Sequence, residues 1–316
     1  MKILITGGAG FIGSNLVSFH LEKGDEVYII DNFITGSKKN IEPFLSNTKF
    51  HCIKSNLINF KFKILNFKFD IVYHLASPAS PCQYKKHPLE TALVNSQGTY
   101  NVLEFMKNSK SKIFVLASTS EVYGDPQIHP QTESYWGNVS PNGPRSCYDE
   151  GKRFAEALTM IYYRKYNLDV RIARIFNTYG PDMEKEDGRV VSNFIMQSLT
   201  NNPLTVYGDG KQTRSFCFVS DMVTGLYTLA TTPNIAGEII NLGNPEEYSI
   251  LDLAKIIKKA TKTDAEIIFK SIDADDPQRR MPDISKAKKI LKWQPKISFN
   301  DGLQKTINYF KQRFLA

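Results

Sequence analysis

A tyrosine and a lysine lie four residues apart in a stretch whose pattern is typical of a helix. Tyr148 and Lys152 would therefore share one helix face. A tyrosine with a pKa of about 10 is a poor base at neutral pH, but a neighbouring ammonium group favours the phenolate. Tyr207 and Lys211 have the same spacing inside a glycine-rich turn, so spacing alone identifies no site. The difference is that Tyr148 follows a predicted strand ending in Ser118–Glu121, whose hydroxyl groups can bond a substrate.

Three glycines follow a GxxGxxG spacing between a predicted strand and a predicted helix. Gly7 permits a tight turn, Gly10 lets the backbone approach a pyrophosphate, and Gly13 allows close helix packing. The helix N-terminus then offers free N–H groups and a positive dipole end to the phosphates. Asp31 ends the second predicted strand, where a carboxylate accepts both ribose hydroxyls and repels a 2′-phosphate. These features favour NAD over NADP and indicate hydride transfer, with Tyr148 taking the proton.

Short apolar runs alternate with helical patterns through the first half of the chain. The predicted strands are Ile3–Ile5, Val27–Ile30, Phe50–Ile53, Ile71–Leu75, Ile113–Ala117 and Val170–Ile175. The predicted helices are Phe11–Lys23, with Gly24 placed to end it, Leu89–Lys107 and Tyr148–Tyr166. This alternation predicts an α/β fold, a Rossmann-type doubly wound parallel sheet with helices on both faces.

The pattern loosens after Asn177, where glycine- and proline-containing loops separate shorter elements. We expect residues 1–177 to form the NAD-binding Rossmann domain and residues 178–316 a smaller C-terminal α/β domain for the substrate. Residues 215–245 are expected to return to the first domain, with Phe216–Val219 and Ile239–Leu242 joining its sheet. Two helical segments are predicted near Ile284–Leu291 and Asp301–Phe314.

Composition excludes several other classes. The 316 residues are 41% hydrophobic and carry a net charge of +8, but the lysines are dispersed, which is typical of a solvated surface and not of nucleic-acid binding. No apolar stretch approaches the roughly 18 residues of a membrane span, and no signal peptide is evident. The four cysteines and five histidines form no CxxC motif and no ligand spacing, so we expect neither a disulfide framework nor a metal site. A cytoplasmic enzyme is the resulting expectation.

Several motifs resemble a known family. Thr6–Gly13, Ser118–Gly124 and Tyr148–Lys152 resemble the extended short-chain dehydrogenases/reductases. Longer blocks covering nearly the whole chain resemble the UDP-glucuronate decarboxylases (UDP-xylose synthases), namely Asp31–Gly36, Leu75–Pro81, Cys147–Arg153, Ala173–Pro181, Asp187–Phe194 and Asp276–Arg280.

The resemblance implies a reaction in which Tyr148 and NAD oxidise C4 of UDP-glucuronate. The C4 ketone is β to the C6 carboxylate, so CO2 is lost and an enolate remains. C5 is then reprotonated and the hydride returns to C4, which gives UDP-xylose and regenerates NAD. The implied catalytic residues are Thr119, Glu121, Tyr148, Lys152 and Arg280. Glu121 would orient the sugar or a water near C5, and Arg280 would hold the carboxylate.

The motifs and the resemblance also imply binding residues. Those for NAD are Gly7, Gly10, Phe11, Ile12, Gly13, Asp31, Asn32, Thr35, Gly36, Asn56, Leu57, Leu75, Ala76, Ser77, Asn95, Tyr148 and Lys152. Those for the UDP-sugar are Tyr84, Asn177, Arg189, Val190, Tyr207, Gln212, Arg214 and Arg280. A homodimer formed through the helices Leu89–Lys107 and Tyr148–Tyr166 is implied as well.

Three alternative functions remain open at this point. A nucleotide-sugar 4,6-dehydratase has an Asp-Glu pair at the strand end, with the Asp as the acid, whereas this chain has Ser120-Glu121. A 4-epimerase usually has a small uncharged residue in place of Glu121. A non-catalytic NAD sensor would have lost the tyrosine, but Thr119, Tyr148 and Lys152 are intact.

Overall fold

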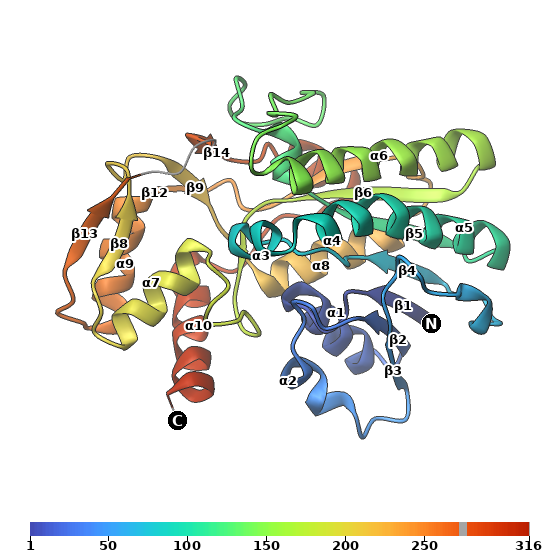
Figure 1. The fold of residues 1–316 in the computed structure, drawn as a ribbon, viewed down its shortest axis with the longest axis horizontal. Helices are drawn as coiled ribbons and strands as arrows, with labels where there is room; N and C mark the ends of the chain where they lie inside the picture. The colour runs from blue at the N-terminus through green and yellow to red at the C-terminus, as the bar shows by residue number, and fades with distance from the viewer. Residues whose placement is uncertain (272–276, 316) are drawn as a thin grey trace.

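The centre of the protein is a large parallel sheet (Figure 1). The computed structural model describes residues 1–271 and 277–315, and within them seven strands follow the order β11-β6-β5-β4-β1-β2-β3. Every neighbouring pair is parallel. The strands are β1 Lys2–Thr6, β2 Glu26–Asp31, β3 Phe50–Lys54, β4 Ile71–His74, β5 Ile113–Thr119, β6 Asp169–Ile175 and β11 Ile239–Leu242. The predicted doubly wound Rossmann-type sheet is confirmed.

Helices cover both faces of this sheet, as the alternation of apolar residues requires. Ile3 and Ile5 of β1 share a buried cluster with Leu16 of α1, whereas Leu4 belongs to the cluster of Val102 in α5. The helix α1 packs against α8 on one face, and α4, α5 and α6 pack together on the other (Figure 1). These helices are α1 Phe11–Glu22, α4 Pro88–Leu93, α5 Thr99–Ser109, α6 Ser146–Tyr166 and α8 Val219–Thr231.

The second half of the chain adds small sheets and further helices beside the large sheet (Figure 1). The pairs are β7 with β10, β8 with β13, and β9 with both β12 and β14. The strands are β7 Thr178–Tyr179, β8 Leu204–Tyr207, β9 Thr213–Ser215, β10 Cys217–Phe218, β12 Glu247–Ser249, β13 Ile267–Lys270 and β14 Arg279–Arg280. The helices are α7 Val190–Leu199, α9 Ile250–Thr261 and α10 Phe299–Phe314, and short helices α2 Lys38–Ile41 and α3 Pro81–Lys86 border the large sheet.

Two segments were expected to return to the large sheet, and one of them does. Ile239–Leu242 pairs with β6 as β11. The prediction for Phe216–Val219 is wrong, because Cys217–Phe218 pairs with β7 outside the large sheet and Val219 begins α8. A short apolar run does not distinguish a strand from the buried start of a helix.

The predicted helix Leu89–Lys107 is interrupted. A π-helical turn, Val94–Gly98, joins α4 to α5. Such wide turns are frequent at functional sites, and this one contains Asn95, which lies behind the wall of the cavity described below. The segment Ile284–Leu291 also contains a π-helical turn, Ala287–Leu291.

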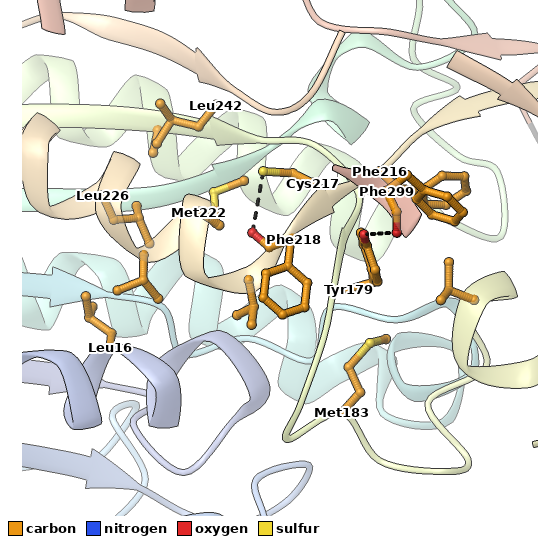
Figure 2. Close-up of a cluster of buried hydrophobic side chains, with 14 of the residues drawn as sticks. Leu16, Tyr179, Met183, Phe216, Cys217, Phe218, Met222, Leu226, Leu242 and Phe299 are labelled. Atoms are coloured by element: carbon orange, nitrogen blue, oxygen red, sulfur yellow. Dashed lines mark hydrogen bonds between the residues drawn. The ribbon is translucent and has the colours of Figure 1, made fainter. Parts of the chain in front are cut away.

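One apolar cluster joins the large sheet to the second half of the chain. Figure 2 shows Leu16 of α1, Met222 of α8 and Phe299 at the start of α10 as members of this cluster. The Tyr179 hydroxyl donates a hydrogen bond to the Phe299 carbonyl at 3.0 Å, one of the dashed lines in the figure. The two parts therefore share a core, which fixes the small sheets relative to the carboxyl ends of the large sheet.

Candidate active site

A cavity of about 450 Å³ lies at the carboxyl ends of the parallel strands, where open α/β sheets bind ligands. Residues that follow β1 to β6 line one part of it, and residues of α7, β8, β9 and β14 line the other. It brings together every predicted catalytic, NAD-binding and substrate-binding residue except Asn95. Asp276, in the predicted Asp276–Arg280 block, lies outside the described residues.

The glycine turn after β1 packs too tightly for a side chain at Gly7 or Gly13. A Cβ on Gly13 would lie 2.2 Å from the Gly7 carbonyl oxygen, and a Cβ on Gly7 would lie 2.8 Å from the Ala76 backbone. Gly7 has a φ of +76°, which only glycine adopts readily. Among the described residues, no side chain caps the N-terminus of α1, and Gly10–Gly13 at this end of the helix line the cavity. This turn fits a pyrophosphate.

Asp31 ends β2 with its carboxylate fixed by the backbone. Its Oδ2 accepts a hydrogen bond from the Ala9 N–H at 3.0 Å, and its Oδ1 accepts one from the Phe33 N–H at 2.8 Å. Burial raises the pKa of Asp31, and these two N–H groups oppose the rise. A Cβ on Gly36 would lie 3.0 Å from both carboxylate oxygens, so the missing side chain leaves space for a ribose. Together these residues fit NAD.

Asn95 lies behind the cavity wall and supports a residue that lines it. Its Nδ2 donates to Ser77 Oγ at 2.9 Å and to the Thr91 carbonyl at 2.9 Å. Its Oδ1 is buried and has no hydrogen-bond partner in the described part of the chain. Asn95 thus orients Ser77, which does line the cavity.

Tyr148, Lys152 and Thr119 meet as the sequence predicted. Burial raises the pKa of Tyr148 to about 12, and a hydrogen bond with the Thr119 side chain opposes this shift. Burial lowers the pKa of Lys152 to about 8. The Lys152 ammonium lies 5.9 Å from the centre of the Tyr148 ring and donates to the Ala117 carbonyl at 2.8 Å. The phenol is therefore protonated in the ligand-free protein, and further positive charge near it would ease its ionisation.

A buried ion pair between Glu156 and Arg174 lies near Lys152. Glu156, one turn after Lys152 on α6, forms hydrogen bonds with Arg174 of β6 at 3.0 and 2.8 Å. Ser118 Oγ also donates to Glu156 at 2.5 Å. The negative charge of Glu156 opposes the lowering of the Lys152 pKa by burial. These hydrogen bonds connect α6 to β5 and β6, one turn of helix away from Lys152.

Glu121 and Arg280 form an ion pair within the cavity. Arg280 Nη1 donates to Glu121 Oε1, and Arg280 Nη2 donates to the Gly124 carbonyl at 2.8 Å. Arg145 Nη2 donates to the other oxygen, Oε2. Burial favours the neutral acid, but the two guanidinium groups outweigh it and hold the pKa of Glu121 well below its usual range. Glu121 is therefore ionised and is not a proton donor in this state.

Sequence reasoning missed Arg145 and Asp149. Arg145 lines the cavity, and its Nε lies 3.7 Å from Asp149 Oδ2. Burial and the charge of Glu121 raise the pKa of Asp149. The available signal was their positions relative to Tyr148: Arg145 is the N-cap residue of α6, three residues before Tyr148, and Asp149 follows Tyr148 in the first turn.

Tyr84 forms a wall of the cavity beside Tyr148. The two rings are stacked, with centroids 5.2 Å apart and an interplanar angle of 7°. The Tyr84 hydroxyl is buried and has no hydrogen-bond partner among the described residues. An unpartnered buried hydroxyl is costly, so this group is available to a bound sugar nucleotide.

The other predicted substrate residues lie along the second-half wall of the cavity. Arg189 Nη2 donates to the Ala79 carbonyl at 3.2 Å, and Gln212 Nε2 donates to the Tyr207 carbonyl at 2.6 Å. Arg214 lies opposite Arg280 in the pairing of β9 with β14. Asn177 Nδ2 is buried without a partner in the part of the chain that is described. Two arginines and several amide groups suit a diphosphate and a base.

No group of three or more His, Cys, Asp or Glu among the described residues is placed to hold a metal ion. Cys52, Cys82, Cys147 and Cys217 are free thiols. Within residues 1–271 and 277–315, no helix combines the length and the apolar character needed to cross a membrane.

Comparison with known proteins agrees with this geometry. The family model for GDP-mannose 4,6 dehydratase matches residues 4–306. UDP-glucuronic acid decarboxylase 1 of Arabidopsis thaliana is 51% identical over 315 residues, which cover 100% of this chain and 71% of that relative. UDP-glucuronic acid decarboxylase 1 of Xenopus tropicalis is 50% identical over 98% of this chain and 72% of its own.

Solved structures show the same fold. The UDP-glucuronic acid 4-epimerase from Bacillus cereus, in complex with UDP-glucuronic acid and NAD, has a TM-score of 0.91 and 33% identity, covering 99% of this chain and 100% of its own. The dTDP-glucose 4,6-dehydratase DesIV from Streptomyces venezuelae has a TM-score of 0.89 and 28% identity, covering 99% of this chain and 98% of its own.

The sheet, the glycine turn and the Tyr148–Lys152 pair define a member of the extended short-chain dehydrogenases/reductases that act on nucleotide sugars. Within that class, the chain belongs to the UDP-glucuronic acid decarboxylase family. The resemblance drawn from the sequence motifs is confirmed.

Proposed function

We propose that the protein decarboxylates UDP-glucuronate to UDP-xylose with NAD as a catalytic cofactor. The observation that carries the proposal is the buried Arg280, which reaches from β14 to Glu121, two residues beyond Thr119. Arg280 would then be a cation for a sugar carboxylate in the same cavity as Tyr148, the group that would deprotonate the C4 hydroxyl. The family relationship supports the same substrate.

The glycine turn and Asp31 would hold NAD, which would supply a reversible hydride acceptor for C4. Tyr148 would take the proton of the C4 hydroxyl, with Thr119 bonded to the same oxygen and the Lys152 ammonium stabilising the phenolate. The resulting β-keto acid would lose CO2 and leave an enolate, a water would protonate C5, and Tyr148 would return its proton to the C4 oxygen when C4 is reduced again. Glu121 stays ionised between its arginines and so would orient the sugar or a water. Arg189, Gln212 and Arg214 would hold the diphosphate and the uridine.

The decisive experiment identifies the products formed from UDP-glucuronate. Purified protein should release labelled CO2 from UDP-glucuronate carrying ¹³C at C6 and form UDP-xylose, identified by NMR, without net accumulation of NADH. A product that keeps the carboxylate with inverted C4 would make the protein a 4-epimerase. Formation of a 4-keto-6-deoxy sugar from UDP-glucose or dTDP-glucose would make it a dehydratase.

We also propose a homodimer and a division of labour between the two halves. Leu89, Leu93 and Tyr100 along the α4–α5 stretch, and Phe154 and Ile161 on α6, are exposed apolar residues. A second copy of the chain that packed α4–α6 against the same helices would cover them. Residues 1–177 would supply the NAD groove and residues 178–316 most UDP-sugar contacts. The four free thiols favour a reducing compartment such as the cytoplasm.

A further inference from the structure

The place of Arg280 in the cavity depends on the chain before and after it, because β14 is a strand of two residues that ends at Arg280. Before the strand, the Gln278 N–H donates a hydrogen bond to Asp125 Oδ1 at 3.1 Å. After the strand, the backbone of Met281 is bonded to Gln131. Both contacts come from the loop that follows β5, so this loop fixes the short strand from both sides.

Gln131 binds the segment after Arg280 with its backbone and with its side chain. Its N–H donates to the Met281 carbonyl at 3.0 Å, and its side-chain Oε1 accepts from the Met281 N–H at 2.9 Å. Its own carbonyl accepts from the Asp283 N–H at 2.9 Å. Gln131 is 0% exposed. Both backbone groups of the residue next to Arg280 are therefore bonded to one buried glutamine.

Gln131 is itself connected to the large sheet. Its Nε2 donates to the Ile128 carbonyl at 2.9 Å, which fixes the orientation of the side-chain amide. Asn241 of β11 donates from Nδ2 to the carbonyls of Gln131 and Asp283, at 2.9 and 3.2 Å. The Tyr123 hydroxyl in turn donates to Asn241 Oδ1 at 2.7 Å. The glutamine therefore links a strand at the cavity to the rigid centre of the fold.

The side chain of Arg280 makes contacts that require an accurate position. It donates from Nη1 to Glu121 Oε1 and from Nη2 to the Gly124 carbonyl at 2.8 Å. Its Nε is buried and has no hydrogen-bond partner among the described residues. A guanidinium is a planar group with donors in fixed directions, so a shift of about 1 Å in its backbone would weaken its fit to a bound carboxylate.

We propose that Gln131 is a positioning residue that sets the place of Arg280 and thereby the selectivity of the cavity for a sugar carboxylate. Within the described part of the chain, the residues that line the cavity do not include Gln131. It therefore acts through Met281 and Arg280 and does not touch the ligand. This inference rests on the proposed function, in which Arg280 holds the C6 carboxylate of UDP-glucuronate.

The test compares two ligands that differ at the carboxylate. NAD-loaded protein is prepared in a Tyr148→Phe background, so that bound UDP-glucuronate is not consumed, and calorimetry gives the Kd of UDP-glucuronate and of UDP-xylose. Gln131→Met keeps most of the side-chain volume but leaves the Met281 N–H without its acceptor. UDP-glucuronate binding should weaken about 3- to 10-fold, because only part of this loss reaches Arg280. UDP-xylose binding should change by less than about twofold.

A purely structural role for Gln131 predicts equal weakening of both ligands, and that result would overturn the inference. Ser134→Ala changes an exposed residue of the same loop and should leave both Kd values unchanged. Thr306→Val removes a buried hydrogen bond to the Gly302 carbonyl of α10, so it should lower the melting temperature without changing the ratio of the two Kd values. Gln131→Leu replaces Gln131→Met if the latter does not fold.

A double variant in the same background shows whether Gln131 acts through Arg280. Arg280→Gln should reduce the preference for UDP-glucuronate, and the addition of Gln131→Met should reduce it no further. Losses that multiply would overturn the link, and so would an Arg280→Gln variant that keeps the preference. Arg280→Lys takes its place if Arg280→Gln does not fold. The proposed function fails separately: wild type that prefers UDP-glucuronate but releases no CO2 contradicts decarboxylation, yet the double variant still decides the role of Gln131.

Discussion

At the scale of single residues, the reactivity of Tyr148 depends on the charges around its ring. Burial raises the pKa of this phenol to about 12 even though the hydrogen bond with Thr119 opposes the rise, so the phenol is a weak acid for a reaction at neutral pH. The Lys152 ammonium lies 5.9 Å from the ring centre, and a positive nicotinamide ring would favour the phenolate further. The phenol oxygen therefore matters during the chemical step and much less during binding.

Replacing Tyr148 by Phe tests this separation. The variant keeps the ring that stacks on Tyr84 but loses the proton acceptor, so kcat should fall about 100-fold or more while KM changes only a few-fold. Steady-state kinetics with UDP-glucuronate gives both constants. Turnover close to that of wild type would exclude Tyr148 as the base.

The raised pKa of Asp149 should be visible in the pH dependence of stability. Folding raises this pKa from 3.8 to about 7, so between these values the folded protein holds a proton that the unfolded chain has released. Stability from this group is present below pH 4 and is lost as pH rises towards 7, with a limiting slope of about 1.4 kcal/mol per pH unit. Asp149→Asn removes the dependence.

Urea unfolding of wild type and Asp149→Asn between pH 4 and 8 measures this effect. The unfolding free energy of wild type minus that of Asp149→Asn should become smaller as the pH rises to about 7 and should then stay constant. Glu266→Gln changes an exposed acid that is not among the charges acting on Asp149 and is the control. Parallel curves for wild type and Asp149→Asn would show that Asp149 titrates as an ordinary acid.

At the scale of elements, the glycine turn and α1 act as one closely packed unit. Gly13→Ala would place a Cβ 2.2 Å from the Gly7 carbonyl, whereas Gly10→Ala would meet the same atom at 3.3 Å. Gly13→Ala should therefore destabilise the fold by about 1–3 kcal/mol and reduce NAD binding as well. Gly10 lines the cavity that would hold the pyrophosphate, so Gly10→Ala should weaken NAD with little change in the melting temperature.

Thermal melts and NAD titrations of the two variants separate these effects. Equal losses of stability would mean that the turn can relax around Gly13. Unchanged NAD affinity in Gly10→Ala would place the pyrophosphate elsewhere.

The elements also show what could be predicted from the sequence. The strands of the large sheet were predictable because each is a short apolar run, and apolar periodicity is local. The Glu121–Arg280 pair joins residues 159 positions apart, so the family resemblance pointed to the two residues but not to their pairing. Arg145 was missed because it meets Glu121 only in the folded chain, and Phe216–Val219 was mispredicted because apolar runs also begin buried helices.

At the scale of the whole molecule, the exposed apolar residues of α6 point to a partner. Phe154 and Ile161 are seven residues apart and therefore lie on one face, and they are 52% and 46% exposed. Phe154→Glu combined with Ile161→Glu should convert a dimer into a monomer. Light scattering coupled to gel filtration at micromolar concentration measures the mass. Leu45→Glu, at an exposed apolar residue outside α4–α6, is the control, and a monomeric wild type would contradict the proposal.

The cluster in Figure 2 has a mechanical consequence. The helices α1, α8 and α10 share one core. A hinge movement that separated the two halves of the chain would therefore expose apolar surface at a cost of about 25 cal/mol per Å². Such a frame resists hinge bending, so ligands would enter and leave by local movements of loops and side chains. A dinucleotide enclosed in a rigid frame exchanges slowly. We therefore expect NAD to behave as a prosthetic group that stays with one protein molecule through many turnovers.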